Sequence, residues 1–174
     1  MNRKIILLGY MGSGKSVIGK RLAEKIQLPF IDLDTFIEKK EEKKIDEIFQ
    51  QKGEIYFRKK EREYLNELLL SPSPMVLALG GGTPCYGDAM QMINKTTENV
   101  FYLQLSFQEL TKRLLPQKKK RPLIAHLEDV DLEDFIRKHL FDRNPFYMQA
   151  NNIIKISGET IEEIIDRIEQ KIKI

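Results

Sequence analysis

The sequence predicts an α/β fold in which a five-stranded parallel sheet carries helices on both faces. Several short apolar runs lack strict alternation, as expected for parallel strands that are buried on both faces. Segments with apolar residues at helical spacing lie between these runs, and this alternation favours a three-layer arrangement. The chain has 174 residues and shows no internal repeat, so we expect one domain over residues 1–174.

Each predicted strand is a short aliphatic or aromatic run. The first, Lys4–Leu8, is almost wholly aliphatic and leads directly into a glycine-rich stretch. The others are 29–33, 75–79, 100–105 and 152–156, of which the last has the weakest pattern.

Helical spacing of apolar residues predicts helices over 15–26, 54–70, 131–149 and 160–172. Residues 38–44 mix charges of both signs, which indicates a solvated helix surface. Residues 71–74 read Ser-Pro-Ser-Pro and predict a loop between a helix and a strand. Residues 118–122 read Lys-Lys-Lys-Arg-Pro and predict an exposed, mobile loop, because Pro116 ends the helical pattern before them.

The composition narrows the classes of function. The net charge of +3 is too small for the dense basic face of a nucleic-acid-binding protein. The single cysteine, Cys85, excludes an intramolecular disulfide and a zinc site built on several thiolates. No apolar stretch approaches the roughly 20 residues that a membrane span needs. We therefore expect a cytoplasmic protein without nucleic-acid or membrane partners, and we expect it to act as a monomer.

The glycine-rich stretch matches a phosphate-binding loop. Residues 9–16 read Gly-Tyr-Met-Gly-Ser-Gly-Lys-Ser, which fits the pattern G-x-x-x-x-G-K-[ST]. Glycines let backbone N–H groups approach phosphates, and the helix that follows presents its N-terminal dipole to the same anion. Lys15 would reach the β- and γ-phosphates, and the Ser16 hydroxyl would bind Mg²⁺. A chance glycine-rich turn is the alternative, but the preceding strand and following helix disfavour it. GTPases, ATPases and small-molecule kinases all use this loop.

Two carboxylates lie where the second predicted strand closes. Alternation along a strand puts Asp32 and Asp34 on the same side of the backbone, at the edge of the sheet where ligands bind. One could help to hold Mg²⁺, and the other could accept a proton from a hydroxyl. The alternative for Asp34 is a helix N-cap, because it directly precedes Thr35.

Further polar positions are weak signals when each is taken alone. Arg58 and Glu61 can pair at i, i+3, and an ordinary surface ion pair is the alternative. Three successive glycines, Gly80, Gly81 and Gly82, would expose backbone N–H groups to a ligand, or simply form a flexible turn. Arg121 and Arg143 would ordinarily be solvated, although an arginine on a mobile loop suits a charge clamp on a transferring phosphate.

Taken together, these pieces resemble the shikimate kinase family over nearly the whole chain. The motifs occur in the family's order: Gly-x-Met-Gly-Ser-Gly-Lys-Ser, Asp-x-Asp, Phe-Arg-x-x-Glu, Leu-Gly-Gly-Gly, Arg-Pro-Leu and Arg-x-Pro-x-Tyr. The resemblance implies the P-loop kinase fold of nucleoside-monophosphate kinases. It also implies a substrate-binding region at about 33–61, a mobile lid at about 113–126, and ATP-dependent phosphorylation of the shikimate 3-hydroxyl in aromatic amino-acid biosynthesis.

The resemblance also implies the roles of single residues. Those expected to bind shikimate are Asp34, Arg58, Gly80, Gly81, Gly82 and Arg143. Those expected to bind ATP are Gly12, Ser13, Gly14, Lys15, Ser16, Val17, Arg113 and Arg121. Ser16 and Asp32 would hold one Mg²⁺, and Lys15, Asp34 and Arg121 would be catalytic.

Two segments depart from the family pattern, and two other functions remain open. Residues 115–120 carry Pro116 and three lysines where small polar residues are expected, and residues 157–160 do not align with the family's adenine-side loop. The alternatives are another small-molecule kinase of this fold, such as a gluconate or nucleotide kinase, and a non-catalytic nucleotide-binding module.

Overall fold

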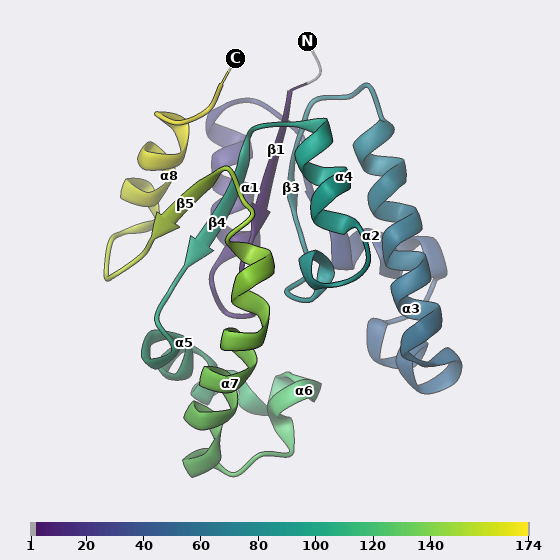
Figure 1. The fold of residues 1–174 in the computed structure, drawn as a ribbon, viewed down its shortest axis with the longest axis vertical. Coiled ribbons are helices and arrows are strands. Elements are labelled where there is room, and N and C mark those ends of the chain that lie inside the picture. Colours follow the sequence, from purple (N-terminus) through teal and green to yellow (C-terminus); the bar gives the residue numbers. More distant parts are fainter. Residues whose placement is uncertain (1–2, 174) are drawn as a thin grey trace.

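The structure, a computed structural model, describes residues 3–173 and is built on a five-stranded parallel sheet (Figure 1). The strand order is β2-β3-β1-β4-β5. The strands are β1 (Lys4–Leu8), β2 (Phe30–Asp32), β3 (Met75–Ala78), β4 (Val100–Gln104) and β5 (Asn152–Lys155). All five predicted strands are present, and the α/β fold is confirmed.

Helices cover both faces of this sheet. They are α1 (Lys15–Lys25), α2 (Leu33–Glu41), α3 (Ile45–Leu70), α4 (Ala89–Thr96), α5 (Phe107–Leu114), α6 (Pro122–Ala125), α7 (Asp129–Tyr147) and α8 (Ile161–Glu169). Figure 1 shows α1 behind the sheet and α4 and α7 in front of it. Ion pairs join α1 to α8, including Lys25 Nζ to Asp166 Oδ1 at 2.6 Å. No helix within residues 3–173 is long and apolar enough to cross a membrane.

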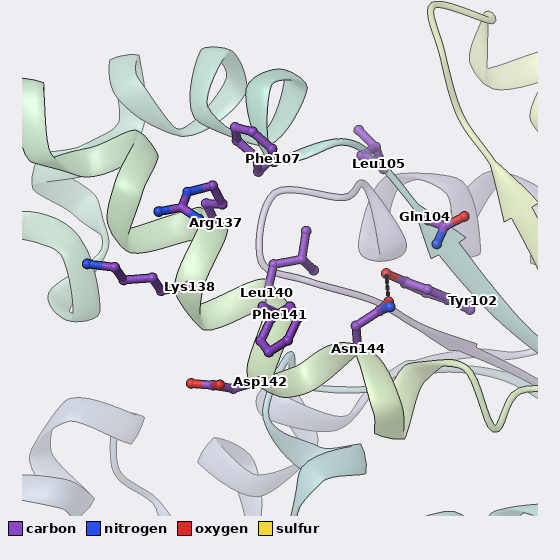
Figure 2. Close-up of a pocket in the computed structure, with 10 residues that line it drawn as sticks. All are labelled: Tyr102, Gln104, Leu105, Phe107, Arg137, Lys138, Leu140, Phe141, Asp142 and Asn144. Carbon is purple, nitrogen blue, oxygen red and sulfur yellow. Dashed lines mark hydrogen bonds between the residues drawn. The ribbon is translucent and has the colours of Figure 1, made fainter.

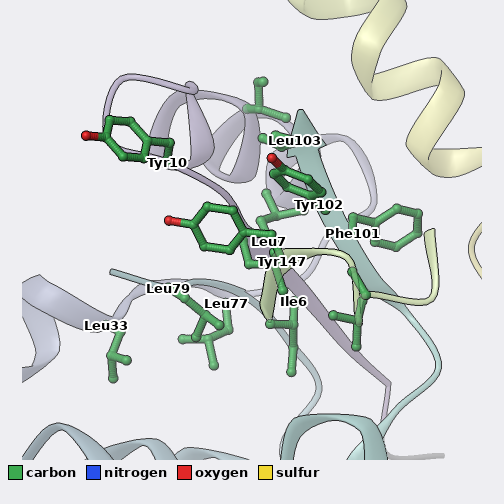
Figure 3. Close-up of a cluster of buried hydrophobic side chains, with 14 of the residues drawn as sticks. Ile6, Leu7, Tyr10, Leu33, Leu77, Leu79, Phe101, Tyr102, Leu103 and Tyr147 are labelled. Carbon is green, nitrogen blue, oxygen red and sulfur yellow. The ribbon is translucent and has the colours of Figure 1, made fainter. Parts of the chain in front are cut away.

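The core is centred on β1, because this strand has a partner on either side and helices above and below. Ile5, Ile6, Leu7 and Leu8 are fully buried. β1 pairs in parallel with β3 on one side and with β4 on the other. Side chains from these strands form one continuous cluster with Tyr147 of α7 (Figure 3). The chain proceeds from β1 to one side of the sheet and later to the other, so a crevice opens at the carboxyl end of β1.

Two helical segments differ from the sequence prediction. α3 begins at Ile45, nine residues before the predicted start at Glu54, but Gly53 interrupts it with φ 78° and ψ 173°. The strong helical pattern therefore belongs to the second half, which follows the glycine. Helix α4 was not predicted, because its eight residues are too few for a periodic pattern to stand out.

Lys119, Lys120 and Pro122 are exposed, as predicted for 118–122, but the prediction of a loop is wrong because the segment is helical. A 3₁₀ helix, η2, spans Leu115–Lys120 and is followed directly by α6. Lys118 is not a solvated charge, since its Nζ donates to the Leu127 carbonyl at 2.7 Å and pairs with Asp129 at the start of α7. Pro116 lies in the first turn of η2, where a proline starts a helical turn more readily than it breaks one.

Candidate functional site

The phosphate loop connects β1 to α1 at the carboxyl edge of the sheet, as predicted. Gly14 is the N-cap of α1 and has φ 94°, a left-handed conformation that side chains rarely adopt. The loop closes on itself, since Ser13 N donates to the Tyr10 carbonyl at 3.2 Å. This arrangement turns the loop toward the N-terminus of α1, where backbone N–H groups and the helix dipole favour an anion.

Lys15 lies buried within this loop. Its Nζ donates to the carbonyl oxygens of Gly9 at 2.8 Å and Tyr10 at 3.0 Å. Burial lowers the pKa of Lys15 to about 8, while the nearby carboxylates of Asp34 and Asp32 oppose that shift. The ammonium group is thus held by weak carbonyl acceptors beside two acidic side chains.

Ser16 and Asp32 lie in direct contact. Ser16 Oγ donates to Asp32 Oδ2 at 2.5 Å, and Asp32 Oδ1 accepts from Thr35 N at 3.2 Å. Asp32, and not Asp34, is therefore the N-cap of α2. Residues 3–173 contain no group of three or more His, Cys, Asp or Glu side chains that could hold a metal. One hydroxyl and one carboxylate do suit Mg²⁺, which usually takes few protein ligands and completes its shell with phosphate oxygens and water.

Asp34 lies in the first turn of α2, so the expectation that it shares a strand face with Asp32 is wrong. β2 ends at Asp32, and the helix begins at once. Burial raises the pKa of Asp34 to about 6, with further upward contributions from Asp32 and Glu61. Lys15 and Arg58 act in the opposite direction. A carboxyl group with a pKa near neutrality suits proton transfer.

The three glycines after β3 are each approached by a different predicted acceptor residue. Glycine has no Cβ atom, so these approaches are measured from the place where a Cβ atom would stand. That place lies 2.7 Å from Asp34 Oδ1 at Gly80 and 2.9 Å from Arg58 Nη2 at Gly82. A Cβ atom on Gly81 would lie 3.3 Å from Arg143 Nη1. Asp34, Arg58 and Arg143 come from three different helices, so the tertiary fold brings them together around a backbone without side chains.

Arg58 and Glu61 do not form the exposed surface pair that was the alternative. Arg58 Nη1 donates to Glu61 Oε2 at 2.8 Å, and the Glu61 residue is only 3% exposed. Thr83 Oγ1 donates to the other oxygen of Glu61 at 2.6 Å. The Arg58 guanidinium lies 3.8 Å from the ring centroid of Tyr86, and its buried Nε is ion-paired with Glu54 Oε1 at 3.6 Å. Sequence reasoning missed Thr83 and Tyr86, since neither belongs to a recognised motif.

The last turns of α7 hold the middle glycine of the triplet in place. Tyr147 is fully buried, and its hydroxyl donates to the Gly81 carbonyl at 2.6 Å. Arg143, one helical turn earlier, has its guanidinium carbon 5.7 Å from the ring centroid of Tyr10. Tyr147 ends the Arg-x-Pro-x-Tyr motif, so the sequence offered a signal for this residue even though we assigned it no role.

A cavity of about 280 Å³ joins the phosphate loop to Asp34, Gly80 and Gly81 of the predicted acceptor site, while Arg58, Gly82 and Arg143 do not line it. Its lining includes Gly12, Gly14, Lys15, Ser16, Val17, Asp32, Asp34, Gly80, Gly81 and Arg121. Arg121 Nη2 lies 3.4 Å from Gln117 Oε1, so η2 also reaches this cavity. Arg113 lies beside the loop, with its Nη1 3.9 Å from a Cβ atom placed on Gly14. Ser13, within the loop, is fully buried.

A larger cavity of about 700 Å³ lies between the end of β4 and α7 (Figure 2). It is lined by residues such as Leu105, Phe107, Leu140 and Phe141, and it contains none of the predicted site residues. The smaller cavity is therefore the candidate active site, because it contains the phosphate loop, the lysine and both carboxylates.

Known proteins match this chain over almost its whole length. The family model for shikimate kinase matches residues 11–173. A shikimate kinase of Flavobacterium johnsoniae is 46% identical over 165 residues, which cover 95% of this chain and 96% of the relative.

Two solved structures extend the match to three dimensions. The shikimate kinase of Bacteroides thetaiotaomicron has a TM-score of 0.89 and 38% identity, with 97% of each chain covered. The shikimate kinase of Acinetobacter baumannii, in complex with shikimate, has a TM-score of 0.86 and 32% identity, with 97% of this chain and 91% of that one covered. The fold, the motifs and these matches agree, and the chain belongs to the shikimate kinase family.

Proposed function

We propose that this chain transfers the γ-phosphoryl group of ATP to the 3-hydroxyl of shikimate through residues that line the 280 Å³ cavity, together with Arg58 and Arg143 beside the glycine triplet. Membership of the family makes it a phosphotransferase with an alcohol acceptor and with ATP as co-substrate. The observation that carries the residue assignment is the approach of Asp34, Arg58 and Arg143 to three successive glycines. These groups suit a ligand that bears both a carboxylate and hydroxyls.

On the donor side, the phosphates of ATP would bind the loop of Gly12, Ser13 and Gly14. Lys15 would exchange its carbonyl partners for phosphate oxygens, which are stronger acceptors because they are charged. Arg121 would stabilise the charge on the transferred group from the lid side, and Val17 and Arg113 would border the rest of the nucleotide. Ser16 and Asp32 would hold Mg²⁺, which when bound neutralises charge on the phosphates.

On the acceptor side, Arg58 and Arg143 would bind the shikimate carboxylate. Arg58 Nη2, which approaches Gly82, offers a charged donor to that carboxylate. Glu61 and Tyr86 fix the plane of that guanidinium. Asp34 would accept a hydrogen bond from the 3-hydroxyl and then its proton, while the glycines let the ring approach the backbone. Because such transition states are loose, positioning contributes at least as much as the strength of the base.

The wider setting of the enzyme is also part of this proposal. We expect one domain over 1–174, with shikimate bound mainly by residues 33–61 and with 113–126 acting as a lid that excludes water. The single cysteine is compatible with a reducing cytoplasm. We expect the enzyme to act as a monomer, without nucleic-acid or membrane partners.

An ADP-release assay with ATP and Mg²⁺ tests the substrate assignment. We expect turnover with shikimate and none above background with gluconate or nucleoside monophosphates. Mass spectrometry should detect shikimate 3-phosphate as the product. Turnover with gluconate alone would favour the other small-molecule kinase, and absence of turnover with every acceptor would favour a non-catalytic nucleotide-binding module.

Replacing Arg58 with alanine is expected to weaken shikimate binding by about ten- to a hundredfold, as expected for the loss of hydrogen bonds to a charged group. ATP affinity should stay within about twofold, since Arg58 lies outside the phosphate loop. Isothermal titration calorimetry with each substrate measures both constants. Arg62→Ala is the matched control, because Arg62 lies on the same helix but is exposed and paired with Asp88. Unchanged shikimate affinity in Arg58→Ala would remove Arg58 from the site.

A further inference from the structure

A tyrosine of the phosphate loop is hydrogen-bonded to a histidine on the helix that carries Arg143. Tyr10 OH and His139 Nδ1 are 2.8 Å apart, and the two rings meet edge to face with centroids 5.5 Å apart. Tyr10 is 1% exposed, and the Phe135 ring also packs against His139, with centroids 5.3 Å apart. The contact is a partly buried link between segments that are 129 residues apart in the sequence.

Both partners of this hydrogen bond are uncharged at neutral pH. Burial raises the pKa of the Tyr10 hydroxyl, so the phenol keeps its proton at neutral pH. Burial, assisted by the positive charge of Arg143, lowers the pKa of His139 to about 4, so the imidazole is neutral. The hydrogen bond therefore joins a neutral phenol to a neutral imidazole, and its direction follows the imidazole tautomer.

Tyr10 also contacts both halves of the candidate site. Its carbonyl accepts from Lys15 Nζ at 3.0 Å, on the side of the phosphate donor. Its ring lies 5.7 Å from the guanidinium carbon of Arg143, on the side of the acceptor. His139 precedes Arg143 by four residues, so both lie on one face of α7. One hydrogen bond thus connects the loop that holds Lys15 to the helix face that presents Arg143.

We propose that His139 is a positioning residue for the transfer reaction, which acts through the Tyr10 hydroxyl to hold Arg143 in register with the phosphate loop. This inference rests on the proposed role of Arg143 in shikimate binding. His139 itself contacts neither substrate. The hydrogen bond limits sliding of α7 against the loop, and such sliding would move the carboxylate-binding arginine relative to the phosphate.

Steady-state kinetics of Tyr10→Phe and His139→Phe test this role. Each variant keeps an aromatic ring and loses the hydrogen bond. We expect each to raise the KM for shikimate by about two- to tenfold, the effect of one hydrogen bond, while the KM for ATP stays within twofold. The double variant should be no worse than the more affected single variant, because both changes remove the same bond. An unchanged KM for shikimate in Tyr10→Phe, or additive effects in the double variant, would overturn the proposal.

Tyr102→Phe is the matched control for loss of a tyrosine hydrogen bond to α7. Tyr102 is equally buried, and its hydroxyl donates to Asn144 Oδ1 at 3.2 Å (Figure 2), but it lies in β4 and not in the phosphate loop. We expect Tyr102→Phe to change the melting temperature about as much as Tyr10→Phe does, but to leave the kinetic constants unchanged. An equal rise of the shikimate KM in Tyr102→Phe would show a general structural effect and would contradict the proposal.

Two further variants complete the experiment. His139→Asn can place a polar atom near the position of Nδ1, so we expect its KM for shikimate to stay close to that of the parent. A KM as high as that of His139→Phe would count against the hydrogen bond. Arg143→Ala separates the two proposals. If it leaves the shikimate KM unchanged, the proposed acceptor site fails as well. If it raises that KM while Tyr10→Phe does not, only the role of His139 is overturned.

Discussion

Replacing Lys15 with methionine is expected to lower kcat for phosphate transfer to shikimate by about a hundred- to thousandfold, the usual effect of removing one group that stabilises transition-state charge. Methionine keeps the length of the side chain but cannot donate to a phosphate oxygen. Shikimate affinity should change little, because Lys15 binds carbonyls of the phosphate loop and not the glycine triplet. Single-turnover kinetics with labelled ATP measure the chemical step directly.

The loss of activity in Lys15→Met should not reflect unfolding. The folded-state pKa of Lys15, about 8, lies below its ordinary value of 10.5, so the buried ammonium opposes folding at every pH below about 8. That penalty is relieved as the pH rises from about 8 to 10.5, where the unfolded chain binds more protons. We therefore expect the melting temperature of Lys15→Met at pH 7 to equal or exceed that of the parent. Lys20→Met, at an exposed position on the same helix, is the control. If the kcat of Lys20→Met were as low as that of Lys15→Met, the catalytic role of Lys15 would be refuted.

Replacing Asp34 with asparagine is expected to lower kcat by about a hundred- to ten-thousandfold, the range for removal of a general base. In the parent, kcat/KM for shikimate should rise with pH through about pH 6, because Asp34 loses its proton there. This ascending limb should be absent from the residual activity of Asp34→Asn. A pH–rate profile from pH 5 to 8 measures it, and an unchanged limb in the variant would show that another group titrates.

The same substitution should stabilise the protein at alkaline pH. The folded-state pKa of Asp34, about 6, exceeds its ordinary value of 3.8, so folding favours the protonated form. The parent should therefore lose stability as the pH rises from about 4 to 6, and the penalty should be complete above pH 6. We expect Asp34→Asn to melt at a higher temperature than the parent at pH 8, with the difference much reduced at pH 4. Asp46→Asn, at an exposed position on α3, should show no such difference.

Much of the fold could be predicted because its signals are local. The apolar run of β1, the glycines of the phosphate loop and the amphipathic pattern of α1 occupy consecutive residues, and their order already predicts a parallel sheet. The same reasoning failed for α4 and for residues 115–125, where helical turns are too short to show a period. It also failed at Asp34, because periodicity does not show that β2 ends one residue earlier than its pattern suggests.

By itself the sequence determined the phosphate loop, the order of the elements and, through six motifs, the family. Only the tertiary structure decided which side chains meet. Arg58, Asp34 and Arg143 lie on α3, α2 and α7 and approach three successive glycines, because the parallel sheet brings the carboxyl ends of its strands to one edge. The burial of Glu61 and the hydrogen bond between Tyr10 and His139 likewise depend on contacts between segments that are distant in the chain. Sequence spacing along one helix or strand contains no information about such contacts, and packing of the layers creates them.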